Sequence, residues 1–268
     1  MLFADLPLAQ RLEGHDARGN AACMEAYARF YPDVGALALP VSGGYAMYAG
    51  VDSPLTQAMG LGMSRPVSAA DLDRMETFYR DRGTAVHIEL CPLADPSLIA
   101  LLNERGYRVE EYSNVLARPL DSYELEAPIR SEAQVYVPSG NEVELWARTV
   151  VEGCAEDAAE ASSLLPLFLT FSRMPAATCF LAGLDGQPAG GGVVSTDGGV
   201  AALFGAGTRP AFRNRGVQTA LLRARLAFAV EAGCDVAMIV TLPGSTSQRN
   251  AERQGFRVMY TRSKMVSD

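Results

Sequence analysis

Residue types that suit an anion gather in the segment 203–222. A strand containing Gly205 and Gly207 leads into the loop Arg213-Asn-Arg-Gly216, and a helix starts directly after it. Backbone N–H groups at a helix start, with the positive end of the helix dipole, suit a phosphate, and a glycine there lets the ligand come close. The two arginines add charge-assisted contacts. An arginine-decorated turn that binds nothing is the alternative.

The charge pattern favours an anion site at this loop. The 268 residues carry a formal net charge of −8, from 31 acidic and 23 basic residues. Residues 1–129 hold 18 acids against 10 arginines, so the whole imbalance lies in the first half. Between Gly198 and Val230 there is no acid but there are five arginines, at positions 209, 213, 215, 223 and 225. A window of one sign indicates an anionic ligand, whereas the acidic whole argues against nucleic acid.

Other phosphate-binding loops fit poorly. The chain has no GxxxxGK[ST] sequence, and Gly205-x-Gly207 is followed by Arg-Pro instead of the last glycine of a dinucleotide fingerprint. Because glycines weaken an ordinary strand, these two predict a bulge or a close ligand approach.

Hydrophobic periodicity predicts an α+β protein. Helices are expected over 17–30, 68–81, 95–106, 142–151, 217–233 and 245–255, and Ser68-x-x-Asp71 and Ser245-x-x-Gln248 have the form of capping boxes. Strands are expected over 36–41, 45–51, 84–90, 107–109, 113–117, 178–184, 189–195, 200–208, 236–240 and 256–260. Residues 152–173 read as less regular, and a proline-containing connection is expected over 121–139.

The two halves share a pattern. Residues 86–109 give a strand, a proline, a capped helix and then Gly106-Tyr-Arg-Val, and residues 236–258 give the same order ending in Gly255-Phe-Arg-Val. This repeat and the shift in charge predict one domain over 1–120, a linker over 121–134 and a second domain over 135–268. Chance similarity of a strand–turn–helix unit is the alternative.

Residues 135–265 resemble the GNAT superfamily of acyl-CoA-dependent N-acetyltransferases. The loop Arg213-Asn-Arg-Gly216-Val-Gln218 matches the family's Arg/Gln-x-x-Gly-x-Gly/Ala pattern except at Gln218, and Ser247-Gln-Arg-Asn250-Ala-Glu-Arg-Gln-Gly-Phe256 is similar to a later motif. The resemblance implies two tandem GNAT-like domains, each a mixed central β-sheet flanked by helices, with the first domain lacking the arginine loop.

The resemblance also implies where acetyl-CoA binds as co-substrate. The strand is expected to pair with the pantetheine arm through the backbone of Phe204, Gly205, Ala206, Gly207 and Thr208, where it parts from 236–240. The pyrophosphate is expected on Arg213, Asn214, Arg215, Gly216, Val217, Gln218 and Thr219. Asn250, with Ser245 or Ser247, is expected on the pantetheine or adenine side. No metal site is expected.

The sequence gives few signals for the side chains that transfer protons in the reaction. An attacking amine must lose a proton, usually to a carboxylate through a water, and a backbone N–H of strand 200–208 is expected to stabilise the oxyanion. The candidate carboxylates for this role are Glu152, Glu156 and Asp157. Each of them can also be an ordinary solvated acid. Glu152 is selected because it directly follows the apolar end of the predicted helix. Ala251 stands where many family members have a tyrosine acid. Tyr260 is either a substitute donor or a packing residue.

The expected function is acetyl transfer from acetyl-CoA to the amine of a small acceptor, with a cationic acceptor suggested by the acidic first half. The alternative is a catalytically silent module that keeps acyl-CoA as a regulatory or structural ligand, and an interaction protein without acyl-CoA is a third possibility. The missing tyrosine favours the silent module, as does the lack of any acid in strands 200–208 and 236–241, where a base is expected.

Composition indicates the compartment. Five cysteines without a CxxC pair read as buried thiols in a reducing compartment. No apolar run reaches membrane length, and the amino terminus does not resemble a secretion signal. We therefore expect a cytoplasmic protein without membrane or nucleic-acid partners, and the sequence leaves monomer and homodimer open.

Overall fold

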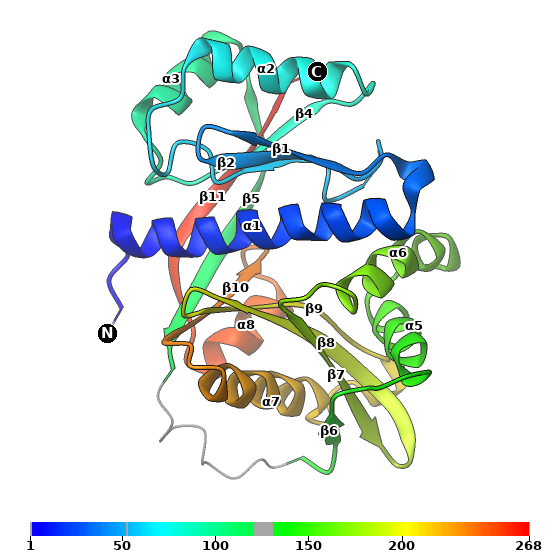
Figure 1. Cartoon of the computed structure of the whole chain (residues 1–268). Helices are drawn as coiled ribbons and strands as arrows, with labels where there is room; N and C mark the ends of the chain where they lie inside the picture. The colour runs from blue at the N-terminus through cyan, green and yellow to red at the C-terminus, as the bar shows by residue number, and fades with distance from the viewer. Residues whose placement is uncertain (1, 52, 121–130, 268) are drawn as a thin grey trace. The chain divides into compact units, whose positions relative to one another are not determined.

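Two units make up the chain in a computed structural model that describes residues 2–51, 53–120 and 131–267 (Figure 1). Unit 1 consists of Met1–Ala117 and Val240–Asp268, and unit 2 of Arg118–Ile239. The segment from 240 onward, assigned by sequence to the second domain, is thus counted with unit 1. The sequence-based domain limits remain a prediction, and the greater part of the expected linker, 121–130, lies outside the described residues.

Unit 1 is built on a mixed sheet in the order β1-β2-β3-β4-β11-β5. The strands are β1 Leu37–Val41, β2 Gly44–Tyr48, β3 Ala58–Met59, β4 Val86–Leu90, β5 Arg108–Pro119 and β11 Arg257–Ser267. β3 and β4 run parallel, and the other neighbours are antiparallel. The two strands that follow the repeated Gly-aromatic-Arg-Val turns, β5 and β11, are direct neighbours, with Arg257 opposite Ala117.

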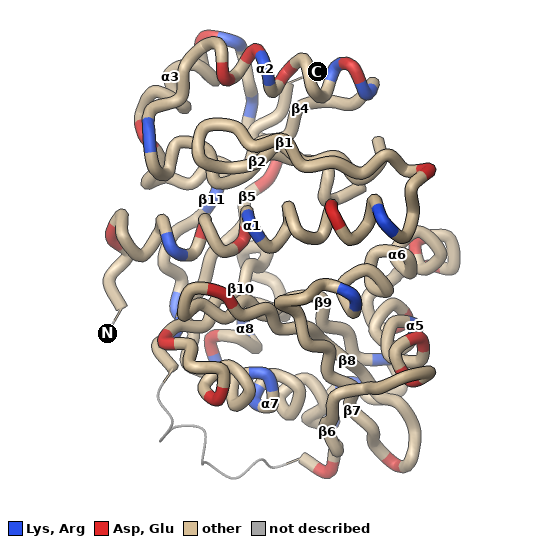
Figure 2. The backbone as a smooth tube through the Cα atoms, in the orientation of Figure 1, with Lys and Arg blue, Asp and Glu red and all other residues tan. Residues whose placement is uncertain are grey.

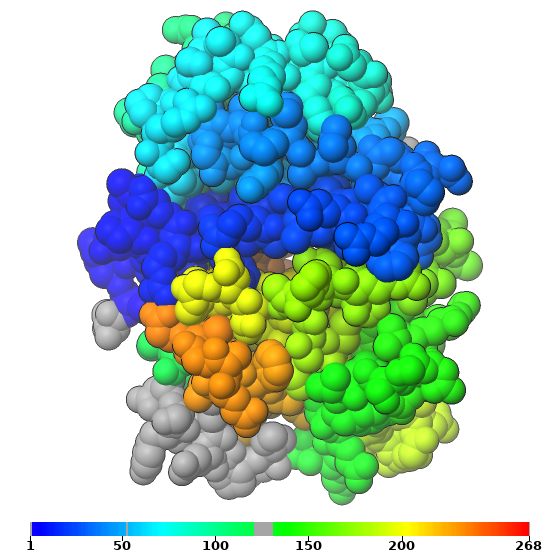
Figure 3. Space-filling view, viewed as in Figure 1, coloured from blue at the N-terminus to red at the C-terminus, as the bar shows by residue number. Residues whose placement is uncertain are grey.

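Helices α1 Leu6–Phe30, α2 Ala69–Arg80 and α3 Pro96–Glu104 complete unit 1 together with α8 Thr246–Arg253. α1 forms a continuous ridge beside the β1–β2 hairpin (Figure 3). It begins eleven residues before the predicted start, with Asp5 as its cap. The hydrophobic pattern did not predict these first turns because Glu13 and His15 occupy buried positions where an apolar residue is expected.

A buried polar network ties β11 to α1. Arg262 Nε lies 2.9 Å from Glu13 Oε1, and Arg262 Nη1 lies 2.9 Å from Asp16 Oδ2. The Tyr260 hydroxyl donates to Glu13 Oε1 at 2.8 Å. Burial, and then the Glu13 carboxylate, raise the pKa of Tyr260. Tyr260 therefore has the packing role that was the alternative to a proton donor.

The strands of unit 2 follow the order β10-β9-β8-β7-β6. The strands are β6 Gln134–Tyr136, β7 Ala177–Leu184, β8 Gln187–Asp197, β9 Val200–Thr208 and β10 Val236–Thr241. The helices are α5 Glu142–Cys154, α6 Ala158–Phe171 and α7 Val217–Glu231. β9 and β10 are parallel, and the other pairs are antiparallel.

Two adjacent glycines of β8 show how this sheet is covered. A Cβ at Gly191 would lie 2.7 Å from Trp146 Nε1 of α5, and a Cβ at Gly192 would lie 2.8 Å from Arg225 Cζ of α7. Successive residues of a strand face opposite sides, so α5 and α7 cover opposite faces. Each unit is a mixed sheet flanked by helices, as expected for an α+β protein.

Most predicted elements are confirmed, and four predictions require correction. α1 starts earlier, the two short strands at 107–117 form the single strand β5, β6 falls inside the expected connection, and α6 occupies the segment that was read as irregular. α6 escaped detection because Pro166 lies inside it and its apolar residues follow no clear helical period.

Candidate functional site

A bulge interrupts β9 at the glycines singled out in the sequence. Val193 pairs with Phe204 and Gly191 with Gly207, so β9 has one residue more than β8 in this interval. Gly205 has φ +51°, and a Cβ there would meet Phe168 and Val193 side-chain atoms at 3.3 Å. The predicted bulge is therefore confirmed, and both backbone conformation and space require the glycine.

β9 also parts from its parallel neighbour. Paired residues run from Val236↔Val200 to Met238↔Ala202, whereas β9 continues to Thr208. Within the described residues of unit 2, the second half of β9 thus has its antiparallel partner β8 on one side and no paired β10 residue on the other. Backbone groups along such a half-paired strand are available to an extended ligand.

The loop after β9 turns sharply into α7. A short 3-10 turn at Pro210–Phe212 precedes Asn214 with φ +62° and Gly216 with φ +80°. Gly216 is the N-cap of α7, no side chain caps the helix, and its first turn contains no acid. α7 carries arginine but no acid before Glu231, its last residue (Figure 2). The first N–H groups of a helix have no acceptor within it, so this helix start suits an anion.

The loop arginines are held by groups of unit 2. Arg213 donates from Nη2 to Gly153 O at 3.1 Å and from Nε to Thr208 O at 3.3 Å. Arg215 Nη2 lies 2.8 Å from Asp185 Oδ2 in the β7–β8 turn. Both arginines are exposed, as is Asn214, and Gln218 and Thr219 are half-buried. Val217 is buried in the core, so its contribution to a ligand site is limited to its backbone.

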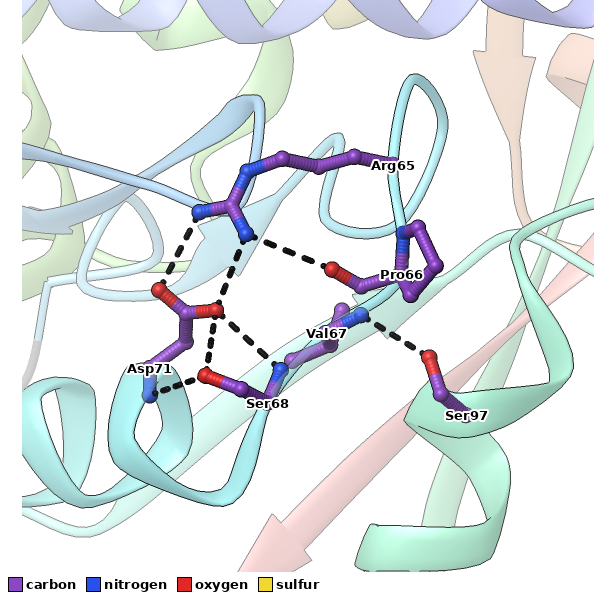
Figure 4. A network of polar contacts seen from close by, with 6 residues as sticks. All are labelled: Arg65, Pro66, Val67, Ser68, Asp71 and Ser97. Carbon is purple, nitrogen blue, oxygen red and sulfur yellow. Dashed lines mark hydrogen bonds and ion pairs between the residues drawn. The ribbon is translucent and has the colours of Figure 1, made fainter.

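The corresponding helix start in unit 1 is filled by the protein's own groups (Figure 4). α2 follows β3 as α7 follows β9, but Ser68 Oγ accepts from Asp71 N and Asp71 Oδ2 accepts from Ser68 N, each at 3.1 Å. Both terminal nitrogens of Arg65 donate to Asp71 at 3.1 Å. Arg65 and then Ser68 hold the pKa of Asp71 well below its usual value. The predicted capping box is confirmed, and it places a carboxylate where unit 2 has none.

Glu152 lies near the end of β9 that leads into the loop. Its Oε2 is 2.9 Å from Arg209 Nε, and just over half of its side chain is exposed. A Cβ on the next residue, Gly153, would lie 2.5 Å from Thr208 N. Thr208 lies three residues beyond Gly205, which corresponds to about 10 Å along a strand. The structure thus brings Glu152 to the end of β9 and to Arg209, and its assignment as a base stays a prediction.

Thr208 and Cys154 add two polar groups beside this strand. Among the described residues, the buried hydroxyl of Thr208 has no hydrogen-bond partner. Cys154 is exposed, unlike the other four cysteines, which are buried and free. The expectation of five buried thiols is therefore wrong at Cys154. Its Sγ donates to Ala206 O at 3.5 Å, and desolvation first and then Glu160 raise its pKa, against an opposing effect of Arg213.

Three predicted ligand residues lie on α8, in unit 1. Ser245 caps this helix by accepting from Gln248 N at 3.1 Å, Ser247 is exposed and Asn250 is half-buried. Gln248 Oε1 accepts from Gly244 N at 2.7 Å and not from Ser245 N, so the predicted capping box is only half formed. These residues belong to unit 1, and their role toward acyl-CoA stays a prediction.

Sequence analysis missed the side chains that support the bulge. Phe204 packs edge-on against Phe171 at a ring-centroid distance of 5.1 Å, Phe171 against Phe168 at 5.4 Å, and Phe168 against Trp146 at 6.1 Å. Two of these aromatics belong to the unrecognised α6. The run Gly190-Gly-Gly192 opposite the bulge was the available signal, since three glycines in one strand indicate close approach by neighbouring elements.

Comparison with known family models identifies a domain in the second half of the chain. The family model described as "Acetyltransferase (GNAT) family" matches residues 145–256, a range that contains the β9 bulge, the arginine loop and α7. Residues 145–256 form a GNAT acetyltransferase domain. The resemblance deduced from Arg213–Gln218 is therefore confirmed.

Solved structures extend this likeness to nearly the whole chain. A GCN5-related N-acetyltransferase from Kribbella flavida is similar with TM-score 0.65 and 19% identity over 92% of this chain and 95% of that one. One from Sphaerobacter thermophilus gives TM-score 0.58 and 18% identity over 94% and 90%. A tandem GNAT protein from the clavulanic acid biosynthesis pathway gives TM-score 0.62 and 16% identity over 99% and 96%. At these identities the likeness shows the fold, which this chain shares with the tandem GNAT protein over almost its whole length.

Two comparisons of other kinds are negative. No curated relative matches the sequence. Across the described part of the chain, no helix combines the length and the apolar character needed to cross a bilayer.

Proposed function

We propose that the GNAT domain transfers an acetyl group from acetyl-CoA to the amine of a small acceptor. The observation that carries this proposal is the start of α7, where Gly216 replaces a capping side chain and the first turn lacks an acid. The family match supports acyl transfer in general, and acetyl-CoA is the co-substrate typical of that family.

The residues present fit a pantetheine-pyrophosphate ligand. The exposed arginines of the loop and the uncapped helix start suit the diphosphate. Thr208 offers a buried hydroxyl that has no partner among the described residues, and the half-paired second part of β9 offers backbone groups to an extended amide-containing arm. Residues 204–208 and 213–219 of unit 2 are therefore the proposed binding set, and the roles expected of Ser245, Ser247 and Asn250 from the family resemblance stay predictions.

The chain's own groups have four tasks in this reaction. The loop and α7 hold the diphosphate, and β9 aligns the thioester, which acetyl-CoA supplies as the activated acyl group. A backbone N–H at the bulge donates to the thioester oxygen as negative charge develops there. Glu152 takes the proton of the attacking amine through a water. With alanine at 251 and Tyr260 buried against Glu13, the thiolate leaves without a tyrosine donor, which a thiol of pKa about 8.5 tolerates.

The assignment of Glu152 gives a specific expectation. Glu152→Gln keeps the size of the side chain and a hydrogen-bonding partner for Arg209 but removes the base, so kcat should fall by about 10²-fold at neutral pH with little change in acetyl-CoA affinity. Glu156→Gln is the matched control on the neighbouring exposed acid. Steady-state kinetics of both variants measure this, and an unchanged kcat for Glu152→Gln would assign the base to another group.

A silent acyl-CoA-binding module is the second candidate. Two observations favour it: Ala251 replaces the tyrosine, and Glu152 pairs with Arg209 at the loop end of β9, not at the bulge. Under this reading the same loop binds acetyl-CoA, but no amine reacts.

Titration calorimetry followed by an amine screen separates these functions. Acetyl-CoA and 3′-dephospho-CoA are titrated into the full chain, and cationic, neutral and anionic amines are then offered with acetyl-CoA. Binding with turnover supports the transferase, and binding without turnover of any amine supports the silent module. Folded protein that binds neither ligand would contradict both.

A further inference from the structure

Arg225 on α7 is a buried charge with an unusual set of partners. The residue is 1% exposed, and its Nε donates to Leu221 O at 3.1 Å. Its Nη1 donates to Val193 O at 3.1 Å and to Phe204 O at 3.4 Å. All three partners are backbone carbonyls of unit 2. Among the described residues no carboxylate pairs with Arg225, whereas another buried arginine, Arg262, has two.

Such an arrangement is costly for folding. A buried ion without a counter-ion loses its hydration, and carbonyl dipoles restore that free energy only in part. Burial lowers the pKa of Arg225 to about 10, so the guanidinium still carries its charge at neutral pH. An apolar side chain at this helix position would avoid the penalty, so a fixed positive charge here calls for a role beyond packing.

The position of the charge indicates that role. Val193 and Phe204 are opposite each other in the β8–β9 ladder, directly before the bulge. A Cβ on Gly192 would lie 2.8 Å from Arg225 Cζ, so a glycine in β8 is needed for the guanidinium to reach these carbonyls. On the other face of the sheet, Phe168 and Phe171 lie against Gly205. The bulge is therefore fixed by aromatic rings on one side and by the guanidinium on the other.

We propose that Arg225 is a positioning residue for acyl transfer, whose guanidinium holds the β9 bulge in shape and places a positive charge behind the backbone that meets the thioester. This inference rests on the proposed acetyl-CoA site on β9. The hydrogen bond to Phe204 O polarises the Phe204–Gly205 peptide and strengthens its N–H as a donor. A preorganised charge near the thioester oxygen stabilises the negative charge that develops there during attack.

Three variants separate charge from shape. Arg225→Met keeps the length of the side chain but removes the charge and the donors. Arg225→Lys keeps the charge with fewer donors. Gly192→Ala leaves the arginine in place but pushes its guanidinium away from the bulge. The Gly192→Ala and Arg225→Lys proteins keep the proposal testable where Arg225→Met fails to fold.

Hydrogen exchange of the ligand-free full chain tests the bulge itself. Amides of residues 203–208 should exchange faster in Arg225→Met and Gly192→Ala than in the native protein, while amides of 217–222 at the start of α7 stay as protected as before. Arg225→Lys should lie between. Native exchange rates at 203–208 in both Arg225→Met and Gly192→Ala would overturn the proposal, and this arm does not depend on acetyl-CoA binding.

Infrared spectroscopy of bound acetyl-CoA labelled with ¹³C at the thioester carbonyl tests the charge. Binding to the native protein should lower the frequency of the carbonyl stretch relative to free acetyl-CoA. Arg225→Met should lose most of that shift, and Arg225→Lys should keep much of it. The acetyl-CoA affinities of both variants should stay within about threefold of native, since the diphosphate contacts lie elsewhere. An equal shift in native protein and Arg225→Met would overturn the proposal. Absence of binding by native protein would instead contradict the proposed function, and the exchange experiment would still decide the role at the bulge.

Discussion

The two units share a strand–loop–helix order but differ in what occupies the start of the helix. At the start of α2, Ser68, Asp71 and Arg65 satisfy one another (Figure 4). At the start of α7, Gly216 leaves the helix without a side-chain cap, Thr219 stands where α2 has its acid, and the loop before the helix carries exposed arginines. A helix start is an anion site only when the protein leaves it unfilled. The difference teaches that duplication of the fold does not duplicate the site, and that unit 2 is the candidate binding unit.

The backbone hydrogen bonding beside the two helix starts also differs between the units. In unit 1, Asp95 N donates to Gly62 O at 2.9 Å, so the loop after β3 is bonded to the segment that follows β4. In unit 2, the paired residues of β9 and β10 end at Met238 while β9 continues to Thr208. One unit closes the gap between its parallel strands with its own backbone, whereas in the described residues of the other the second half of β9 has no paired β10 residue.

The strongest test of this comparison gives α7 the acid of α2. Thr219 is the third helical residue of α7, as Asp71 is of α2. Thr219→Asp should weaken acetyl-CoA binding by roughly 100-fold, since two charges about 4 Å apart interact by several kcal/mol near a protein surface. Calorimetry measures the affinity, and Thr219→Asn, of similar shape but neutral, is the control. Equal affinities for the Asp and Asn variants would show that no phosphate lies at this helix start.

A smaller loss is expected from the loop arginine. Arg213→Ala removes a charge-assisted contact and the brace to Gly153, so acetyl-CoA affinity should fall by about 10- to 100-fold. Arg65→Ala in the filled loop of unit 1 should leave affinity unchanged. Titrations at low and high salt sharpen the test, because the loss should shrink as salt screens the charge. Equal effects of the two variants would remove the contrast between the loops.

The smallest effect concerns stability. Asp71→Asn should lower the free energy of unfolding at pH 7 by about 1 kcal/mol through the lost helix cap, without affecting acetyl-CoA binding. The folded-state pKa of Asp71 is depressed, so its contribution is full above the ordinary carboxyl pKa of about 4, begins to shrink below it and is lost as pH falls through the depressed folded-state pKa. Urea unfolding at pH 7 and pH 3 measures this, and a difference between native and variant that persists undiminished at pH 3 would contradict the assignment.

The sequence predicts those features that depend on local signals. Ser68 and Asp71 mark the start of α2, Gly205 and Gly207 mark the bulge, and Gly216 with its arginines marks the loop, because each of these depends on a few adjacent residues. The repeat at Gly106 and Gly255 likewise predicts the tandem fold, and both glycines have positive φ.

Features that depend on tertiary packing were not predictable. Arg225 belongs to an arginine-rich window and gives no sign of being buried, because its partners are carbonyls of two distant strands. The early start of α1 depends on Glu13 and Asp16 meeting Arg262, nearly the whole chain away. The exposure of Cys154 and the pairing of Glu152 with Arg209 depend on where α5 ends against β9.

Hydrogen exchange with and without acetyl-CoA tests the central claim most directly. The full chain carries both helix starts, so one experiment compares them in the same molecule. Acetyl-CoA should slow exchange in residues 203–208 and 213–222 of unit 2 and leave residues 60–75 of unit 1 unchanged. Slowed exchange at 60–75, or bound acetyl-CoA without slowed exchange at 213–222, would contradict the account.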